Sequence, residues 1–264
     1  MSILEAALLG LVQGITEFLP ISSSGHLLIV PAIFGWDAHA MDFDVVVHIA
    51  TLLAVVWAFW PDLRRMANMA RGKSKERQLV YKIIVATIPV GALGVFLAKT
   101  GLIEAIRDPA IILSGLMGWG VLLWVADIYS TKRKQKIVCS EDVTWKKSLL
   151  IGCVQALALL PGTSRSGITM TFGLFTGLNR KTAAHFSFLL AIPAIAGAGF
   201  VTGLDVLQSG FETDATPLVI GFISAFLSGV LAIKVLMHIV ERTSYAWFGA
   251  YRILLGAILW LVLL

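Results

Sequence analysis

Charged residues are scarce in this sequence. Only 14% of its 264 residues are Asp, Glu, Lys or Arg, whereas hydrophobic residues make up 58%. A soluble domain typically carries about 25% charged residues. A chain this apolar cannot cover itself with polar side chains in water. The composition therefore excludes a soluble domain, a disordered chain and a fibrous repeat, and it indicates an integral membrane protein.

The sequence also has only two cysteines and no basic residue near its start. The two cysteines are Cys139, in a basic loop, and Cys153, in an apolar segment. This placement indicates neither a disulfide scaffold nor a thiolate metal site. The first basic residue is Arg64. Because a cleavable signal peptide needs a basic leader, we expect the first apolar segment to belong to the mature protein.

The net charge of +5 comes from loops and does not indicate nucleic-acid binding. Two loops, Arg64–Arg77 and Lys132–Lys147, hold most of the Lys and Arg, without the interleaved aromatic residues of a nucleic-acid surface. Basic loops alternate along the chain with neutral or acidic ones, which hold Asp37, Asp42, Glu104, Asp108, Asp205, Glu212 and Asp214. The positive-inside rule therefore predicts that the basic loops are cytoplasmic and the acidic loops lie outside.

Six apolar runs each approach the roughly 20 residues that a helix needs to span a bilayer. They cover residues 43–60, 79–98, 109–128, 183–203, 217–240 and 245–264. Two further apolar stretches, 1–36 and 148–178, are interrupted by Pro20 with a serine run and by Pro161 with Gly162. Proline, glycine and serine end helices and form turns. We therefore expect two re-entrant helix–turn–helix hairpins.

The two interrupted stretches resemble each other in sequence. Leu8–Gln13 aligns with Leu150–Gln155, and the same offset aligns Ser22–Gly25 with Ser164–Gly167. Three spans separate the copies, so the second copy enters the membrane from the opposite face. This pattern predicts an inverted-topology repeat whose broken helices meet at a polar site. The predicted fold is all-α, with one polytopic domain over residues 1–264 and repeats over about 1–128 and 148–264.

Polar residues collect at the two predicted breaks. Gln13 and Glu17 share one helix face, and a carboxylate inside an apolar segment indicates either function or a structural ion pair. Serine clusters usually serve only as helix caps, but a capped helix N-terminus also binds anions, and the second copy adds Arg165. Together these groups predict a phosphorylated ligand with Mg²⁺ or Ca²⁺, held by Glu17 and the Gln13 carbonyl.

These motifs resemble one known family. Residues 13–17, QGITE, resemble the (E/Q)xxxE motif of the bacterial undecaprenyl-diphosphate phosphatases, which confer bacitracin resistance. Residues 17–26, EFLPISSSGH, resemble that family's EFLPxSSxGH run, and residues 161–169, PGTSRSGIT, match its PGxSRSxxT motif at every specified position. The resemblance extends over the whole chain in length, span order and motif placement.

The resemblance implies an enzyme of the bacterial cytoplasmic (inner) membrane with two re-entrant hairpins in inverted repeat. Such an enzyme hydrolyses undecaprenyl diphosphate to the monophosphate and phosphate, which recycles the lipid carrier for peptidoglycan synthesis. The site is expected to face the outer, periplasmic side, with the polyprenyl lipid and bilayer lipids as partners and no nucleic acid. The sequence does not decide between a monomer and a homodimer.

The resemblance also assigns roles to individual residues. Glu17 matches the family's essential acid, Ser23 its candidate nucleophile, and Arg165 its phosphate-binding arginine. His26 matches a histidine that acts as nucleophile or as acid and base, and direct attack by water remains an alternative. Gln13 occupies a position where some members have Glu, so one carboxylate fewer is present here. Substrate binding is assigned to the small residues Ser22, Ser24, Gly25, Ser164, Ser166, Gly167 and Thr169.

Other interpretations remain open at this point. Inverted repeats with broken helices also occur in transporters, so a carrier or flippase for a phosphorylated lipid or anion is the main alternative. Asp44 and His48 share a helix face and form either a supporting pair beside the site or an interfacial pair. Five further polar residues in or near the spans are expected to reach toward the basic-loop side: Lys82, Asp127, Lys234, His238 and Arg252.

Overall fold

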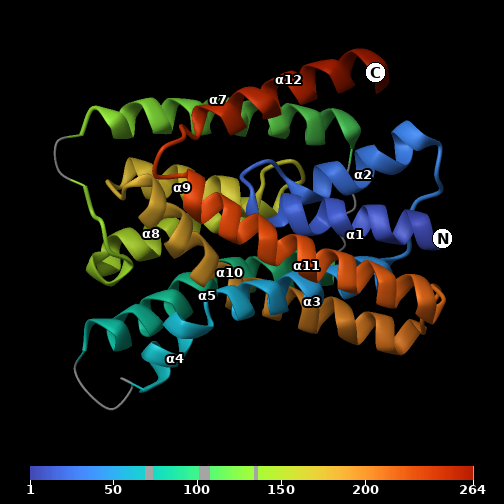
Figure 1. Cartoon of the computed structure of the whole chain (residues 1–264), viewed down its shortest axis with the longest axis horizontal. Helices are drawn as coiled ribbons and strands as arrows, with labels where there is room; N and C mark the ends of the chain where they lie inside the picture. The colour runs from blue at the N-terminus through green and yellow to red at the C-terminus, as the bar shows by residue number, and fades with distance from the viewer. Residues whose placement is uncertain (69–73, 101–107, 134–135, 264) are drawn as a thin grey trace.

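The computed structural model describes residues 1–68, 74–100, 108–133 and 136–263, and nearly all of them lie in helices (Figure 1). The all-α prediction is therefore confirmed. Several of the loop charges lie outside the described residues, namely Arg71, Lys73, Glu104, Arg107 and Lys134.

Five helices are long and apolar enough to cross a membrane. They are α3 (Met41–Ala58), α5 (Lys75–Thr100), α7 (Pro109–Thr131), α10 (Arg180–Ser209) and α11 (Ala215–Ile239). Each coincides with one predicted span, so the protein is a multi-pass membrane protein. The sixth predicted span corresponds to α12 (Ala246–Leu263), whose apolar stretch Ala246–Val262 is shorter than any of these five helices.

The two interrupted stretches form helical hairpins. The first consists of α1 (Ile3–Phe18) and α2 (Ser23–Phe34). The second consists of α8 (Trp145–Gln155), a 3₁₀ turn over Ala156–Leu159, and α9 (Arg165–Phe175). A helix of 11 residues, such as α8 or α9, is only about 17 Å long, which is too short to cross a bilayer. The hairpins enter from opposite ends of the molecule (Figure 1), as the predicted inverted repeat requires.

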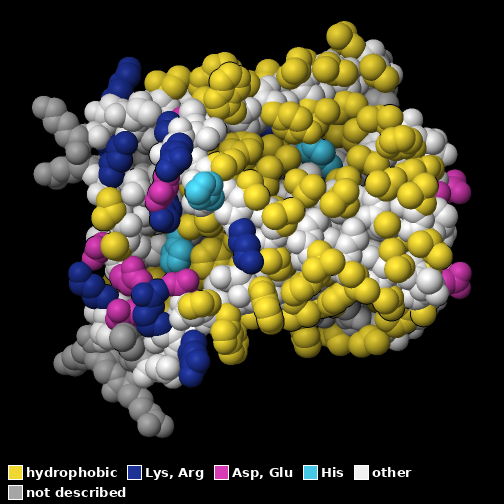
Figure 2. Space-filling model, in the orientation of Figure 1, with side chains coloured by type: hydrophobic (Ala, Val, Ile, Leu, Met, Phe, Trp, Pro, Cys, Tyr) yellow, Lys and Arg dark blue, Asp and Glu magenta, His cyan; other side chains and the backbone are white. Residues whose placement is uncertain are grey.

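The spanning helices enclose these hairpins. Helix α1 packs along α11, which also packs on α3, while α8 packs on α5 and α9 packs between α10 and α7. Helix α12 pairs with α7 at one edge of the molecule (Figure 1). Hydrophobic side chains cover the middle of the visible surface, and charged side chains gather at its two ends (Figure 2). The core contains Phe18, Phe186 and Phe188, which join the tip of α1 to α10.

One buried ion pair fixes the basic-loop end of the bundle. Asp127 on α7 accepts two hydrogen bonds from Arg180 at the start of α10, at 2.6 and 2.7 Å, and another from Ser244. The Asp127 side chain is only 2% exposed. The hydroxyl of Tyr245 donates to the Arg180 carbonyl. Asp127 was predicted to reach toward the basic-loop side, and it does lie there, but its carboxylate finds its donors inside the protein.

Replacement of Asp127 tests this pair. Asp127→Ala leaves Arg180 with an uncompensated charge, and breaking a buried pair costs about 3–5 kcal/mol. We expect a clearly lower thermal midpoint in detergent. The control is Glu241→Ala, because Glu241 pairs with Lys181 while both side chains are about half exposed. Exposed pairs contribute little, so the control should unfold near the wild-type temperature. Equal midpoints for the two variants would contradict the assignment.

Candidate active site between the two helix breaks

The centre of the site is a buried ion pair between the two hairpins. Glu17 lies near the end of α1, and Arg165 is the first residue of α9, 148 positions later. The Arg165 Nη2 atom donates to Glu17 Oε1 at 2.9 Å. The two side chains are 8% and 13% exposed. The fold therefore brings the predicted acid and the predicted phosphate-binding arginine into direct contact.

The second oxygen of Glu17 faces the first break. The Ser23 hydroxyl donates to Glu17 Oε2 at 2.7 Å, and the Gln13 amide donates to the same oxygen at 3.3 Å. The Gln13 Oε1 atom is buried and has no hydrogen-bond partner among the described residues. A single carboxylate thus contacts the candidate nucleophile on one side and the guanidinium on the other.

Both breaks adopt the same unusual backbone conformation. Ser22 and Ser164 have φ values of 76° and 69°, and they are the only non-glycine residues with positive φ in the described part of the chain. They are also equivalent in the predicted repeat, and each immediately precedes a helix. A non-glycine residue in this region costs about 1–3 kcal/mol. In this conformation the first turns of α2 and α9, which carry Ser23 and Arg165, face the same carboxylate, Glu17.

The other predicted substrate-binding residues surround these turns. The Ser164 hydroxyl accepts a hydrogen bond from the Gly167 amide, and Ser166 donates to the Leu19 carbonyl of the first hairpin. Thr169 donates to the Arg165 carbonyl and bonds Ser187, whose carbonyl accepts from Arg165. The contacts of Ser166 and Thr169 are therefore with the protein framework, and these residues position Arg165.

A cavity of about 360 Å³ opens from this ion pair. Its polar lining consists of Glu17, Ser22, Ser23, Ser24, Ser164, Arg165, Asp44 and His48. Its apolar lining includes Val90 on α5, Leu159, and the α10 residues Ala194, Ile195 and Ala198. The lining from α3 comes from the start of that helix, and the lining from α10 comes from its second half. Both segments lie toward the acidic loops, so the cavity occupies that half of the molecule.

His26 lies beside the cavity and is not one of its lining residues. Its Nδ1 atom donates to the Ser22 carbonyl at 2.7 Å, because a carbonyl can only accept. Its Nε2 atom is 2.7 Å from the hydroxyl of Tyr251 on α12, and the two rings stack. Both ring nitrogens are thus engaged with the protein. The geometry favours a role for His26 in holding the first turn.

Arg252 on α12 is the residue that sequence reasoning missed. It was predicted to reach toward the basic-loop side, but it is 0% exposed and contacts the two helix breaks. It donates to the Pro20 carbonyl of the first break and to the Gly162 and Thr163 carbonyls of the second. The sequence feature that could have identified Arg252 is its position between apolar residues of a helix, because charged residues within membrane helices usually face the interior of the protein. Arg252 therefore connects both turns.

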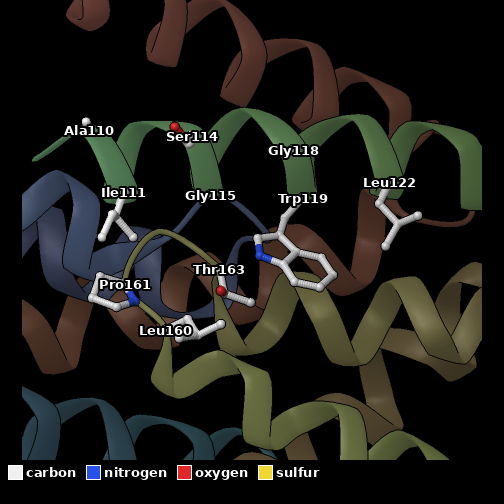
Figure 3. Close-up of a pocket in the computed structure, with 10 residues that line it drawn as sticks. All are labelled: Ala110, Ile111, Ser114, Gly115, Gly118, Trp119, Leu122, Leu160, Pro161 and Thr163. Atoms are coloured by element: carbon white, nitrogen blue, oxygen red, sulfur yellow. The ribbon is translucent and has the colours of Figure 1, made fainter. Parts of the chain in front are cut away.

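The second turn also separates the cavity from an apolar groove of about 650 Å³. Figure 3 shows Pro161 and Thr163 opposite Trp119 and Gly115 of α7. A Cβ atom at Gly115 would lie 3.0 Å from the Pro161 carbonyl oxygen, so a small residue lets α7 approach this turn. The turn is thus held by α7 and by Arg252, which also donates to the Leu116 carbonyl of α7.

The residues present fit a divalent cation that takes most of its ligands from a substrate. No group of three or more His, Cys, Asp or Glu side chains that could hold a metal occurs within the described residues. The Glu17 carboxylate offers hard oxygen ligands at the cavity, and Gln13, which donates to that carboxylate through its amide nitrogen, has a buried Oε1 atom without a partner among the described residues. Mg²⁺ is usually held by one or two protein ligands together with phosphate oxygens and water.

Comparisons with known proteins agree with the motifs. The family described as Bacitracin resistance protein BacA matches residues 6–258. The Undecaprenyl-diphosphatase 2 of Stutzerimonas stutzeri (strain A1501) is 42% identical over 265 residues, which covers 98% of this chain and 97% of that protein. The Undecaprenyl-diphosphatase of Moorella thermoacetica is 42% identical over 262 residues, with the same coverage of 98% and 97%.

Replacement of Arg252 tests its connection of the two breaks. Arg252→Met keeps the length of the side chain but removes every donor, and each buried carbonyl left without a donor costs about 1–3 kcal/mol. We expect a strong loss of thermal stability in detergent. The matched control is Lys234→Met, because Lys234 is a basic residue of a span that is exposed. A stable Arg252→Met protein with an unchanged midpoint would show that the turns do not need this residue.

Proposed function

Because the chain belongs to the bacitracin resistance protein BacA family, we infer that it is an undecaprenyl-diphosphatase whose reaction takes place at the Glu17–Arg165 pair. Such an enzyme hydrolyses undecaprenyl diphosphate to undecaprenyl phosphate and inorganic phosphate. This reaction returns the lipid carrier to peptidoglycan synthesis, and the family name associates it with bacitracin resistance.

The observation that carries this proposal is the lining of one cavity, which combines charged and apolar groups. The lining includes a carboxylate, a serine hydroxyl and a guanidinium together with apolar residues of α5 and α10. A prenyl diphosphate has the same two parts, a charged head group and a hydrocarbon tail. The polar groups suit the diphosphate, and the apolar residues suit the first isoprene units.

Arg165 is suited to bind the terminal phosphate. A guanidinium has five N–H donors in a fork that fits phosphate oxygens. Two of its nitrogens are engaged, one with Glu17 and the other with the Ser187 carbonyl, and its remaining donors are free to bind the head group. The first turns of α2 and α9 add amide donors and the positive end of each helix dipole. These groups would stabilise the charge that develops on the phosphoryl oxygens.

Ser23 is the nucleophile that the geometry favours. Its hydroxyl already donates to Glu17 Oε2, so the carboxylate is placed to accept the proton as Oγ attacks the terminal phosphorus. The bond between that phosphorus and the bridging oxygen breaks, and undecaprenyl phosphate leaves with the bonding electrons. Water then hydrolyses the phosphoserine, and Glu17 returns the proton to Ser23. Arg165 keeps Glu17 in position throughout.

A divalent cation would complete this site. Glu17 and Gln13 Oε1 are the residues that would hold it, and a bound cation neutralises charge on the phosphoryl group. The chain itself orients the head group through Arg165, and it keeps the carboxylate in a largely buried place.

The location follows from the loops and the cavity. We propose that the protein lies in the bacterial cytoplasmic membrane with its basic loops inside, as the positive-inside rule predicts. The cavity lies in the half of the molecule nearer the acidic loops, at the start of α3 and the end of α10. The head group would therefore enter from the outer side.

Single substitutions at the ion pair test the proposed site. Loss of one preorganised electrostatic partner typically lowers the rate by about 10²–10³. We expect Glu17→Ala and Arg165→Ala each to lose at least that much phosphate release from undecaprenyl diphosphate, measured with purified protein in detergent. Gln13→Glu is the control and should remain active. Because a carrier needs a sealed compartment, activity in detergent also separates the phosphatase from a transporter. Full activity of Arg165→Ala would contradict the proposal.

Removal of divalent cations tests the proposed cation. Chelator should abolish phosphate release in the same detergent assay, because the phosphoryl charge then lacks its counter-ion. Addition of Mg²⁺ or Ca²⁺ in excess of the chelator should restore it. Activity that survives complete chelation would contradict a required cation while leaving the phosphatase assignment intact.

A further inference from the structure

His48 is a third residue that faces Glu17 Oε2. It lies on α3 and lines the cavity, and its side chain is 36% exposed. Its Nε2 atom is 3.9 Å from Glu17 Oε2. This distance is too long for a hydrogen bond. The ring therefore points a nitrogen toward the carboxylate without donating to it.

The other ring nitrogen of His48 fixes the ring and its tautomer. Nδ1 lies 2.7 Å from the Asp44 carbonyl, and a carbonyl only accepts, so Nδ1 carries the proton. In the neutral ring, Nε2 then presents its lone pair to the cavity. Histidines that bind metals are held in this way, with one nitrogen donating to a carbonyl or carboxylate and the other bound to the ion.

The spacing of the two atoms also suits a shared ion. Metal–nitrogen and metal–carboxylate bonds are about 2.0–2.2 Å long, so two ligands of one ion can lie up to roughly 4.2 Å apart. The 3.9 Å between His48 Nε2 and Glu17 Oε2 lies within this limit. By contrast, His26 has both nitrogens engaged and does not line the cavity.

We propose that His48 is a ligand of the divalent cation, together with Glu17. This inference rests on the proposed function and assigns a metal ligand that the two sequence motifs do not contain. Glu17 and Gln13 then supply oxygen ligands and His48 a nitrogen ligand, and the remaining positions are left for water and the diphosphate. Glu17 and His48 are only two residues of the types His, Cys, Asp and Glu, which agrees with the lack of a larger cluster of these types in the described part of the chain.

The ligand set has a consequence for the choice of metal. Ca²⁺ and Mg²⁺ prefer oxygen ligands, whereas imidazole suits transition-metal ions. Mn²⁺ is suited to the oxygen ligands of this site and, as a transition-metal ion, accepts an imidazole more readily than Ca²⁺ does, so a His48 ligand raises the affinity for Mn²⁺ relative to Ca²⁺. The preference for Mn²⁺ over Ca²⁺ should depend on His48, because the other ligands at the site are oxygen atoms.

The direct test is electron spin-echo spectroscopy of Mn²⁺ added to purified full-length protein in detergent, with methylene diphosphonate in place of the substrate. A coordinated imidazole produces a nitrogen coupling in the Mn²⁺ signal. We expect this coupling in the wild-type protein and in His26→Gln, the matched control, and its loss in His48→Gln. Removing the ligand should also weaken Mn²⁺ binding by at least about 10-fold.

Several results would overturn the assignment: no nitrogen coupling in the wild-type protein, coupling that persists in His48→Gln, or no bound Mn²⁺. A merely structural role for His48 would alter stability but leave the nitrogen coupling in place. Phosphate release by the same wild-type preparation reports on the proposed function separately. Active protein without a histidine coupling would refute the ligand alone, whereas inactive protein would refute the phosphatase assignment.

Discussion

The buried contact between Glu17 and Arg165 is the constraint on which the rest of the site depends. Burying two charges in an apolar molecule is expensive, and the cost is offset only when the pair has good geometry and additional hydrogen bonds. Here Ser23 and Gln13 satisfy the carboxylate, and the Ser187 carbonyl satisfies the guanidinium. Burying either charge without the other would be unfavourable, so the ion pair holds the ends of the two hairpins together.

The two hairpins contribute different chemistry although their turns have the same shape. Ser22 and Ser164 share the positive φ, but the following residue is a hydroxyl donor in one copy and a cation in the other. At the repeat offset, Glu17 corresponds to Leu159, which also lines the cavity. The repeated backbone thus provides two turns of the same shape that carry different side chains, and the proposed reaction uses these differences for phosphate binding, proton transfer and contact with the tail.

Much of this architecture could be predicted from the sequence. Runs of about 20 apolar residues locate the spans, and Pro20 and Pro161 locate the breaks, because hydropathy and helix termination are local properties. The motifs also name Glu17, Ser23 and Arg165. The contacts of Arg252 could not be predicted, since they depend on distant carbonyls of both turns. The sequence offered Asp44 and His48 as a pair beside the site, and both line the cavity, but the distance from His48 to Glu17 depends on the position of α3 beside α1. For His26 the motif suggests a role in catalysis, whereas its contacts in the structure suggest that it holds the first turn in place.

The position of Arg252 in the chain has a consequence for biogenesis. Translation reaches this residue after every other member of the site, and α12 must enter the bilayer before its guanidinium can meet the carbonyls at Pro20 and Gly162. Until then a nascent chain holds both hairpins without the group that joins their turns. Membrane insertion of the last helix is therefore the event that completes the enzyme.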